Sequence, residues 1–337
     1  MNTLSESGNR IEASGVIKKI FAFREIGLLL IITVFIIVMS FASDFFLQWS
    51  NIKVLLGSFS IDGIVVVGMT IILISGGIDL SVGQVLCLGM TVCSRLYADG
   101  MNPWVAALVA LLVCIGIGFA IGILVTKFKL SHFIVTLCFM GIARGLNLIT
   151  TRGMPISLIS IMGIYPAFTF LGQGQIGGFF PMTVLIFIIV VVVAEFFVRN
   201  SAMMRRVFYT GSSEQAAIYS GIDTNKIKLA ACVLSSFLAG CAGILYMNKF
   251  GGAQLTAGNG LELIAIASAV IGGASLTGGR GTILGAVLGI TLIALVQNAM
   301  TLFVVPPFWQ DLIRYLIVLI AVFLDNMQHT RRIRMQQ

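Results

Sequence analysis

Long apolar stretches alternate along this chain with short segments rich in polar residues, Gly or Pro. A helix that crosses the hydrocarbon core of a bilayer needs about 20 predominantly apolar residues. About ten stretches approach this pattern, and each predicts a membrane-spanning helix. They cover residues 26–42, 54–75, 80–96, 104–125, 133–149, 182–198, 229–247, 261–274, 283–301 and 312–324. The pattern is weakest in the third and eighth stretches.

Composition supports a membrane protein. Hydrophobic residues make up 58% of the 337 residues and charged residues only 10%, whereas a soluble globular protein has about 25% charged residues. So few charges cannot cover a core of this size with a water-soluble surface. The six cysteines show neither paired nor metal-ligand spacing, so we interpret them as small core residues. The sequence therefore predicts an all-α polytopic membrane protein without a disulfide framework or a metal site.

The basic residues indicate the orientation of the spans, because short basic loops stay in the cytoplasm. With ten spans and a cytoplasmic N-terminus, 15 of the 21 Lys and Arg residues fall on the cytoplasmic side. Both termini are therefore predicted to be cytoplasmic. The basic residues are scattered between spans, so the net charge of +8 indicates orientation in a membrane and not nucleic-acid binding. We divide the chain into an N-terminal tail (1–25), a transmembrane domain (26–325) and a C-terminal tail (326–337). The longest polar stretch between spans, 199–228, is where a soluble cytoplasmic partner could bind.

Two glycines and a carboxylate lie between the second and third spans. Gly76 and Gly77 permit a break in the helix, and Asp79 and Ser81 can cap the helix that follows. One interpretation is an ordinary helix cap at the membrane edge. The other is a discontinuous helix on a translocation path, since irregular backbone is tolerated in a membrane only inside protein or beside a wet cavity.

A related stretch follows the eighth span. Gly272, Gly273 and Ser275 repeat the pattern at an offset of 196 positions from Gly76, and a helix rich in small residues is predicted after each copy. The match is either chance in a chain with 37 glycines or a sign of internal duplication, from which many transporter folds are built. No Gly-Lys-(Ser/Thr) sequence occurs, so the chain is not itself a P-loop ATPase.

Asp62 is the most interior ionisable residue of the predicted spans, and such residues are functional candidates because burying a charge in a membrane is costly. It either faces a polar cavity or bonds to the nearby Ser58 and Ser60 or to a neighbouring helix.

Other charged residues in or near the spans have simpler explanations. Glu262 and Asp311 lie near the starts of spans, where a carboxylate suits a helix N-terminus. Arg314 is placed to pair with Asp311, and Arg199 with Glu195.

Enzyme chemistry is not indicated. The two histidines, His132 and His329, form no metal-binding or Ser-His-Asp pattern, and no helix carries paired carboxylates on one face. His132 is predicted to be an interfacial residue at the start of a helix.

Three ordered blocks carry a family resemblance: 69–83, 211–222 and 257–281. Across about 51–325, the chain resembles the ribose-type, or simple-sugar, permease subunits of bacterial ATP-binding-cassette importers. The resemblance implies a multi-pass protein of the bacterial cytoplasmic (inner) membrane that translocates a sugar or sugar-like molecule. Its implied partners are a second permease subunit, identical or homologous, an extracytoplasmic sugar-binding protein, and an ATPase subunit that binds the ATP. The permease itself then needs no cofactor.

The resemblance also implies roles for residues. A short amphipathic helix over 210–222 looks like the segment that docks into the ATPase; its coupling residues are Gly211, Ser213, Glu214, Ala216, Ala217, Ser220 and Gly221. Ser213 stands where the family usually has Asn, and Asp62 where it commonly has a neutral residue. For the substrate pathway we expect Asp62, Gly76, Gly77, Asp79, Ser81, Gly272, Gly273 and Ser275.

The main competing function is an ion-coupled secondary transporter of a small polar solute. A proton-coupled carrier should show buried acid or His relays across several spans, and only Asp62 and Asp79 qualify here. A membrane-embedded enzyme would need a catalytic group that the sequence does not offer.

Overall fold

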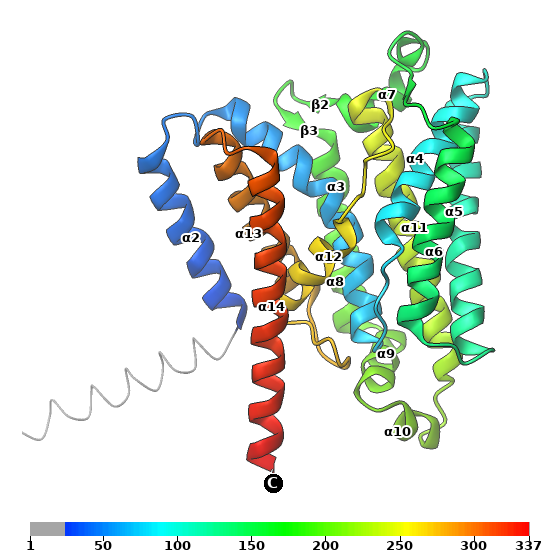
Figure 1. Ribbon diagram of the computed structural model, residues 1–337, viewed down its shortest axis with the longest axis vertical. Coiled ribbons are helices and arrows are strands. Elements are labelled where there is room, and N and C mark those ends of the chain that lie inside the picture. Colours follow the sequence, from blue (N-terminus) through cyan, green and yellow to red (C-terminus); the bar gives the residue numbers. More distant parts are fainter. Residues whose placement is uncertain (1–23, 337) are drawn as a thin grey trace, which may run out of the picture.

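The structure, a computed structural model, describes residues 24–336 and consists almost entirely of α-helices (Figure 1). The predicted N-terminal tail, 1–25, lies almost wholly outside the described residues. Each of the ten predicted spans corresponds to a helix: α2 (Arg24–Ala42), α3 (Trp49–Ile74), α4 (Val82–Ala98), α5 (Pro103–Thr126), α6 (His132–Thr151), α8 (Met182–Asn200), α11 (Thr224–Phe250), α12 (Leu261–Ile271), α13 (Ile283–Leu302) and α14 (Pro307–Gln336). The segment 326–336 of the predicted C-terminal tail continues α14.

The helices differ in their capacity to cross a membrane. Within the described residues, seven of them are long and apolar enough to do so by length and composition. The two predicted spans with the weakest pattern, α4 and α12, are shorter, with 17 and 11 residues. At about 1.5 Å per residue, α12 covers about 16 Å, half of a hydrocarbon core of about 30 Å. The prediction for the eighth span is therefore wrong in length: the helix ends at Ile271, and a Gly-rich turn follows.

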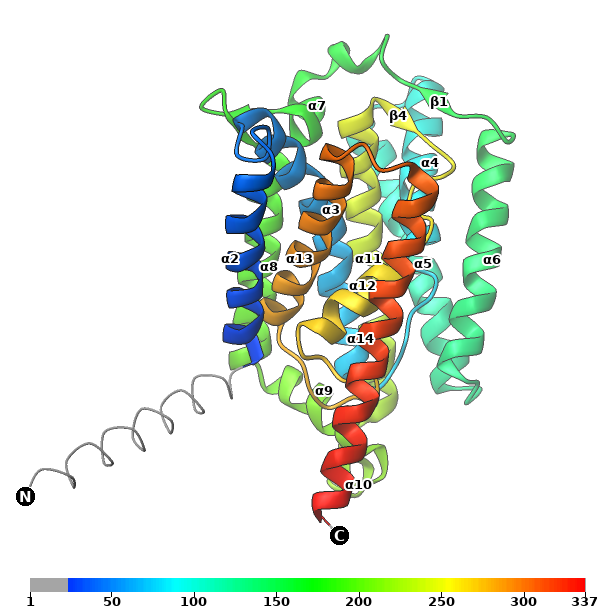
Figure 2. The same cartoon turned by 60° about the vertical axis from the view of Figure 1, so that its left-hand side comes forward.

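Helix α11 occupies the centre of the molecule and packs against α3, α4 and α5 (Figure 2). Small residues let the backbones approach closely, as is common where helices pack in membranes. A Cβ atom on Gly243 of α11 would overlap the Leu86 carbonyl oxygen of α4, and one on Gly118 of α5 would stand 2.7 Å from the Cys232 carbonyl oxygen of α11. The core is thus held by contacts for which larger side chains leave no room.

Short elements cover the two ends of the bundle. At one end lie β1 (Ile156–Ser157), a 3-10 turn (Met162–Ile164), α7 (Pro166–Gln173), β2 (Gln175–Ile176), β3 (Phe180–Pro181) and β4 (Gly252–Ala253). Antiparallel pairs form between β1 and β4 and between β2 and β3. At the opposite end lie α9 (Ala202–Ser212) and α10 (Glu214–Tyr219), on the side where α14 ends (Figure 1).

Two irregular segments interrupt the bundle. Residues 75–81 connect α3 to α4, and residues 254–260 connect β4 to α12. The second segment lies on the first turn of α4, where the backbones of Gly258 and Gly83 touch, since a Cβ atom on either would overlap the carbonyl oxygen of the other. Farther along, the position of a Cβ atom on Gly260 lies 2.8 Å from the Tyr315 hydroxyl of α14. Tyr315 is eight residues, or about 12 Å, from the first residue of α14, so this segment reaches the interior of the bundle.

The close contacts of α11 generate a prediction. Gly243→Val should lower the stability of the detergent-solubilised protein by about 1–3 kcal/mol, because the added methyl groups collide with the Leu86 backbone. Gly141→Val in α6 is the matched control, since a Cβ atom there meets nothing within 4 Å. Thermal unfolding followed by size-exclusion chromatography compares the two. Equal stability of both variants would contradict this account of the core.

Candidate functional site

Three segments that are far apart in the sequence meet at the α9–α10 end of the bundle. The Gly279 N–H donates to the Ile74 carbonyl oxygen at the end of α3, at 2.9 Å. Gly211, near the end of α9, packs against both of these groups, and Gly278 packs against both Gly76 and Gly211. We call this contact of Ile74, Gly76, Gly211, Gly278 and Gly279 the glycine junction. It joins all three sequence blocks that carry the family resemblance.

The junction depends on the absence of side chains. A Cβ atom on Gly211 would overlap the Ile74 carbonyl oxygen and stand 2.6 Å from the Gly279 nitrogen. Gly76 adopts a φ of 85°, a left-handed conformation that side chains disfavour, and this ends α3 as the sequence predicts. Any larger residue at Gly211 would push α9 away from the end of α3.

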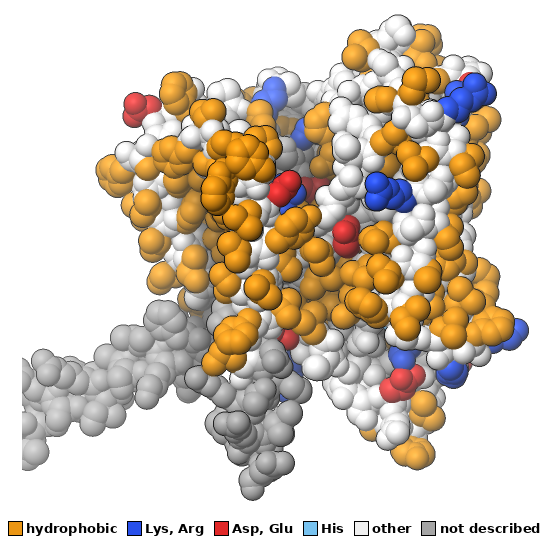
Figure 3. Space-filling model, in the orientation of Figure 1, with side chains coloured by type: hydrophobic (Ala, Val, Ile, Leu, Met, Phe, Trp, Pro, Cys, Tyr) orange, Lys and Arg blue, Asp and Glu red, His pale blue; other side chains and the backbone are white. Residues whose placement is uncertain are grey.

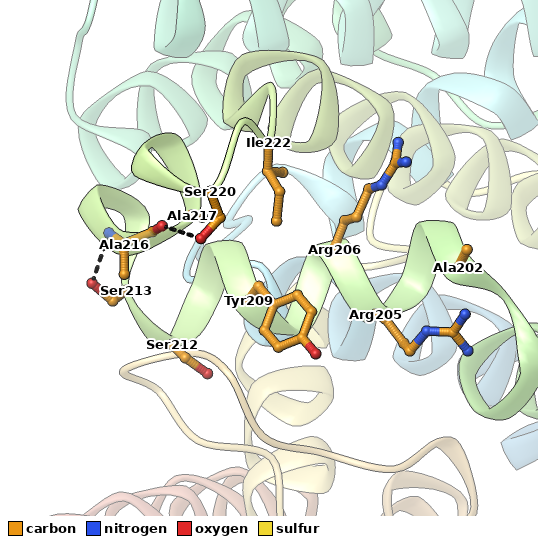
Figure 4. Close-up of a pocket in the computed structure, with 10 residues that line it drawn as sticks. All are labelled: Ala202, Arg205, Arg206, Tyr209, Ser212, Ser213, Ala216, Ala217, Ser220 and Ile222. Atoms are coloured by element: carbon orange, nitrogen blue, oxygen red, sulfur yellow. Dashed lines mark hydrogen bonds between the residues drawn. The ribbon is translucent and has the colours of Figure 1, made fainter.

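The short helix expected between Thr210 and Ile222 is α10 (Glu214–Tyr219). Ser213 adopts an extended conformation, with φ −160°, so it separates α9 from α10. Its hydroxyl caps α10 by accepting a hydrogen bond from the Ala216 N–H at 3.3 Å (Figure 4). Beyond α10, Gly221 has a φ of 77°, so the chain turns at this glycine.

A groove of about 480 Å³ lies between α9 and α10 (Figure 4). It is lined by Ala202, Arg205, Arg206, Tyr209, Ser212, Ser213, Ala216, Ala217, Ser220 and Ile222. Ala216 and Ser220 are exposed, as a contact surface requires, whereas Ala217 is only 3% exposed. Of these three small residues from the expected coupling segment, Ala216 and Ser220 are therefore the ones open to a partner. With two arginines beside small side chains, the groove suits a protruding segment that carries hydrogen-bond acceptors.

An ion pair fastens α10 to α11. Glu214 accepts a hydrogen bond from the Lys228 ammonium at 2.6 Å and another from the Thr224 hydroxyl at 3.4 Å. The hydrogen bond from Lys228 holds the pKa of Glu214 below its usual value. Since α11 is the central helix, α10 is connected both to the core and, through α9, to the glycine junction.

Asp79 is a buried anchor, with 1% of its surface exposed. One carboxylate oxygen accepts hydrogen bonds from the Ser81 N–H at 2.9 Å and the Ser81 hydroxyl at 2.6 Å. The other accepts from the Ser235 hydroxyl of α11 at 3.1 Å. Ser81 occupies the N-cap position of α4, but no side-chain cap bond forms, so the predicted capping role of both side chains is wrong. Asp79 instead ties the irregular segment 75–81 to the central helix.

His132 is the residue near this segment that the sequence analysis missed. It begins α6 as predicted, and its part-buried ring also holds the irregular segment 75–81. Its Nδ1 lies 2.7 Å from the Ile78 carbonyl oxygen, and its Nε2 lies 3.3 Å from the Cys232 sulfur. In the sequence, this role was indicated only by a single histidine directly before an apolar span.

Asp62 lies in the middle of α3 and accepts a hydrogen bond from the Tyr246 hydroxyl of α11 at 3.1 Å. It also lines a cavity of about 180 Å³ between α3, α12 and α13. The nearby serines bond elsewhere: Ser58 accepts from Lys249 at 3.3 Å, and Ser60 donates to the Leu56 carbonyl oxygen. The structure thus supports the cavity and the bond to a neighbouring helix, and not the serine alternative.

The predicted ion pairs and the position of Glu262 are confirmed, whereas Asp311 is the fifth residue of α14 and lies beyond the first turn of that helix. Arg199 pairs with Glu195 at 2.5 Å, and Arg314 pairs with Asp311 at 3.3 Å. Glu262 lies in the first turn of α12, where its carboxylate faces the positive end of the helix dipole.

The second glycine motif packs against α13. Gly272 ends α12 directly against the Gly285 backbone, Gly273 has a φ of 108°, and the Ser275 hydroxyl lies 2.9 Å from that of Thr277. The residues expected on the pathway therefore fall in three places, around Asp62, in segment 76–81 and in segment 272–275, and do not form one site. Within the described residues, no cluster of His, Cys, Asp and Glu could hold a metal ion.

The Asp79 anchor generates a second prediction. Asp79→Leu would leave the Ser81 N–H and two hydroxyls buried without an acceptor, at a cost of about 1–3 kcal/mol for each unpaired group. Asp79→Asn keeps one oxygen acceptor, so we expect it to retain most of the folded protein. Ser235→Ala, which removes one donor, is the mild control. Thermal unfolding of the purified variants tests this order, and equal losses for Asn and Leu would refute the anchor.

Comparison with known proteins adds independent information. Residues 51–322 match the family described as branched-chain amino acid transport system / permease component. The ribose import permease protein RbsC of Bacillus subtilis is 34% identical over 323 residues, which cover 96% of this chain and 97% of the relative. RbsC of Escherichia coli K12 is 33% identical over 88% of this chain and 92% of the relative. The L-arabinose permease AraH of Azospirillum brasilense is 31% identical over 91% of this chain and 88% of the relative. No solved structure matches.

These relatives match most of the chain, and they favour an ATP-driven importer over the ion-coupled alternative. The predicted family resemblance is confirmed. The chain belongs to this permease family and is a multi-pass membrane subunit of an ATP-binding-cassette importer.

Proposed function

We propose that this subunit carries a simple sugar across the membrane, driven by ATP that partner subunits bind and hydrolyse. The names of the relatives, which are ribose and L-arabinose permeases, support a sugar of this size. An extracytoplasmic binding protein delivers the sugar, and a second permease subunit, identical or homologous, completes the pore.

In this proposal the α9–α10 end is cytoplasmic and the α7 end faces outward. Helix α2 begins and α14 ends at the α9–α10 end, as expected if both termini lie on one side (Figures 1 and 2). The basic residues of 199–228 gather at this end, in agreement with the preference of Lys and Arg for the cytoplasm. The α7 end, with its two small strand pairs, then forms the docking surface for the binding protein.

The glycine junction is the observation that carries the proposal. A partner that fills the groove between α9 and α10 would move α9, and with it Gly211. Gly211 touches both the end of α3 and the turn after α12, so one displacement reaches the two helices that adjoin the irregular segments. Packed elements with two discrete arrangements transmit motion in this way. The junction would thus couple ATPase closure to the transmembrane pathway.

The groove makes a prediction for ATPase binding. Ala216→Trp should weaken co-purification of the ATPase about tenfold or more, equivalent to about 1.4 kcal/mol, because the indole fills the groove. Ile218→Trp is the control, since Ile218 lies on the same helix, is exposed and does not line the groove. Undiminished ATPase binding by Ala216→Trp would place the ATPase elsewhere.

The junction makes a separate prediction. Gly211→Val should still bind the ATPase but lose most ATP-driven uptake, because the side chain separates α9 from Ile74. Gly163→Val is the control, since a Cβ atom on Gly163 meets nothing within 4 Å. Uptake into reconstituted vesicles and ATP hydrolysis are measured together. Normal uptake by Gly211→Val would remove the junction from the coupling path.

Topology is tested with reporter fusions. A reporter after Arg334 or near Ser212 should report the cytoplasm, and one near Gly174 at the C-terminal end of α7 should report the outside. A cytoplasmic signal at Gly174 would overturn the orientation.

A further inference from the structure

The irregular segment 254–260 exposes polar side chains on one long face of the bundle. Gln254, Thr256 and Asn259 are all exposed. The segment runs between α14 on one side and α4 and α6 on the other (Figure 1). Figure 3 shows this face, where acidic and basic side chains stand among the hydrophobic ones at half height as well as at the ends. A surface that only met lipid would not carry charges at this depth.

The depth of the segment follows from its contacts. Gly258 touches Gly83 in the first turn of α4, and Gly260 lies beside Tyr315, about 12 Å along α14 from its outer end. Arg144, exposed on α6, is 12 residues, or about 18 Å, from the start of that helix. These residues therefore lie between the two ends of the bundle, at a depth where helices that cross a membrane meet hydrocarbon, and not in a loop at either end.

Lipid cannot cover such a segment. Within 254–260, backbone bonds connect Ala257 to Gln254 and Asn259 to Thr256, whereas the N–H groups of Leu255, Thr256 and Gly258 have no partner among the described residues. Each unpaired peptide group in hydrocarbon costs several kcal/mol, so irregular backbone at this depth must face water or protein.

A chain of amides connects the segment to the buried core. Gln84 Nε2 of α4 donates to Asn259 Oδ1 at 2.7 Å, and Asn147 Nδ2 of α6 donates to the Gln84 carbonyl oxygen at 3.2 Å. Thr91 completes the chain by donating to Asn147 Oδ1 at 2.8 Å. Gln84 and Asn147 are buried, so the chain holds the segment at one fixed point, Asn259.

Unused polar groups remain at the exposed end of this chain. The Asn259 NH₂ group and the side chains of Gln254 and Thr256 have no hydrogen-bond partner among the described residues. Amides and hydroxyls offer donors and acceptors without net charge, which is the complement of a polyol. A charged solute would find no matching charge among these three side chains.

We propose that Gln84, Gln254, Thr256 and Asn259 form a binding station for the hydroxyl groups of a neutral polyol, in a water-filled path whose far wall is a second copy of this chain. The substrate class rests on the proposed function; the water-filled path does not. A hydroxyl that reaches the site competes for the Gln84–Asn259 bond, so binding would release the segment from its fixed point.

Thiol labelling tests the path without requiring transport. In a Cys138→Ser background, which removes the exposed native thiol, Asn259→Cys and Thr256→Cys should react with a charged, membrane-impermeant thiosulfonate about tenfold or more faster than Leu108→Cys. Leu108 is the matched control because it is 58% exposed on the apolar α5. The complete transporter in vesicles is used.

Equally slow reaction at all three positions would overturn the path. Spontaneous disulfides between two copies at Asn259→Cys, without reagent labelling, would show a dry subunit contact and overturn it as well.

Uptake tests the binding station. Asn259→Asp keeps the acceptor for Gln84 but removes the free NH₂ donor, so it should fold normally and raise the KM for ribose uptake about tenfold, with ATPase binding intact. Asn259→Gln, which restores a donor, should recover part of this loss. An unchanged KM in Asn259→Asp, with rapid labelling of Asn259→Cys, would show a path without a binding station. If the wild-type chain shows no ATP-driven uptake of ribose or arabinose, the proposed sugar function fails, while the labelling result still decides the path.

Discussion

A peptide group cannot be left unpaired in hydrocarbon, and the architecture of this permease subunit depends on how the chain meets that constraint. Most of the chain does so by remaining helical. Two exceptions, 75–81 and 254–260, are held by groups from other segments: Ser235, which donates to Asp79, and His132 hold the first, and Gln84 holds the second.

At the glycine junction, the need to pair a peptide group also connects separate helices. At the end of α3 the Ile74 carbonyl oxygen lacks a helical partner, and the Gly279 N–H supplies one. The carbonyl group at the end of α3 thereby holds the turn that follows α12. Gly211 fits against both because none of the three segments carries a side chain there. This contact therefore connects the end of α3 and the turn after α12 to α9.

Much of this fold could be predicted from local pattern alone. Apolar stretches located all ten helices, and the break at Gly76 and the left-handed turn at Gly221 follow from properties of glycine itself. The pairing of Glu195 with Arg199 was predictable because residues four apart share a helix face. These features depend on residues that are neighbours in the sequence.

The errors involve contacts between distant segments. Residues 261–274 are mainly apolar, but α12 ends at Ile271, where Gly272 packs on Gly285 of another helix. The amide chain assembles Gln84, Asn147 and Asn259 from three separate segments, and each alone resembles an ordinary polar residue. Ala217, which we expected among the coupling residues, is buried, and the local pattern of 210–222 does not show this packing.

The contact between Gly83 and Gly258 has a consequence for how fast this part of the molecule can rearrange. Where segment 254–260 lies on the first turn of α4, backbone meets backbone, so the rotation of a side chain cannot loosen the contact. Side-chain rotations occur within nanoseconds, whereas collective movements of packed helices take microseconds to milliseconds. The position of the segment is therefore insensitive to the fast fluctuations and changes only with the slow movement of the helix on which it lies.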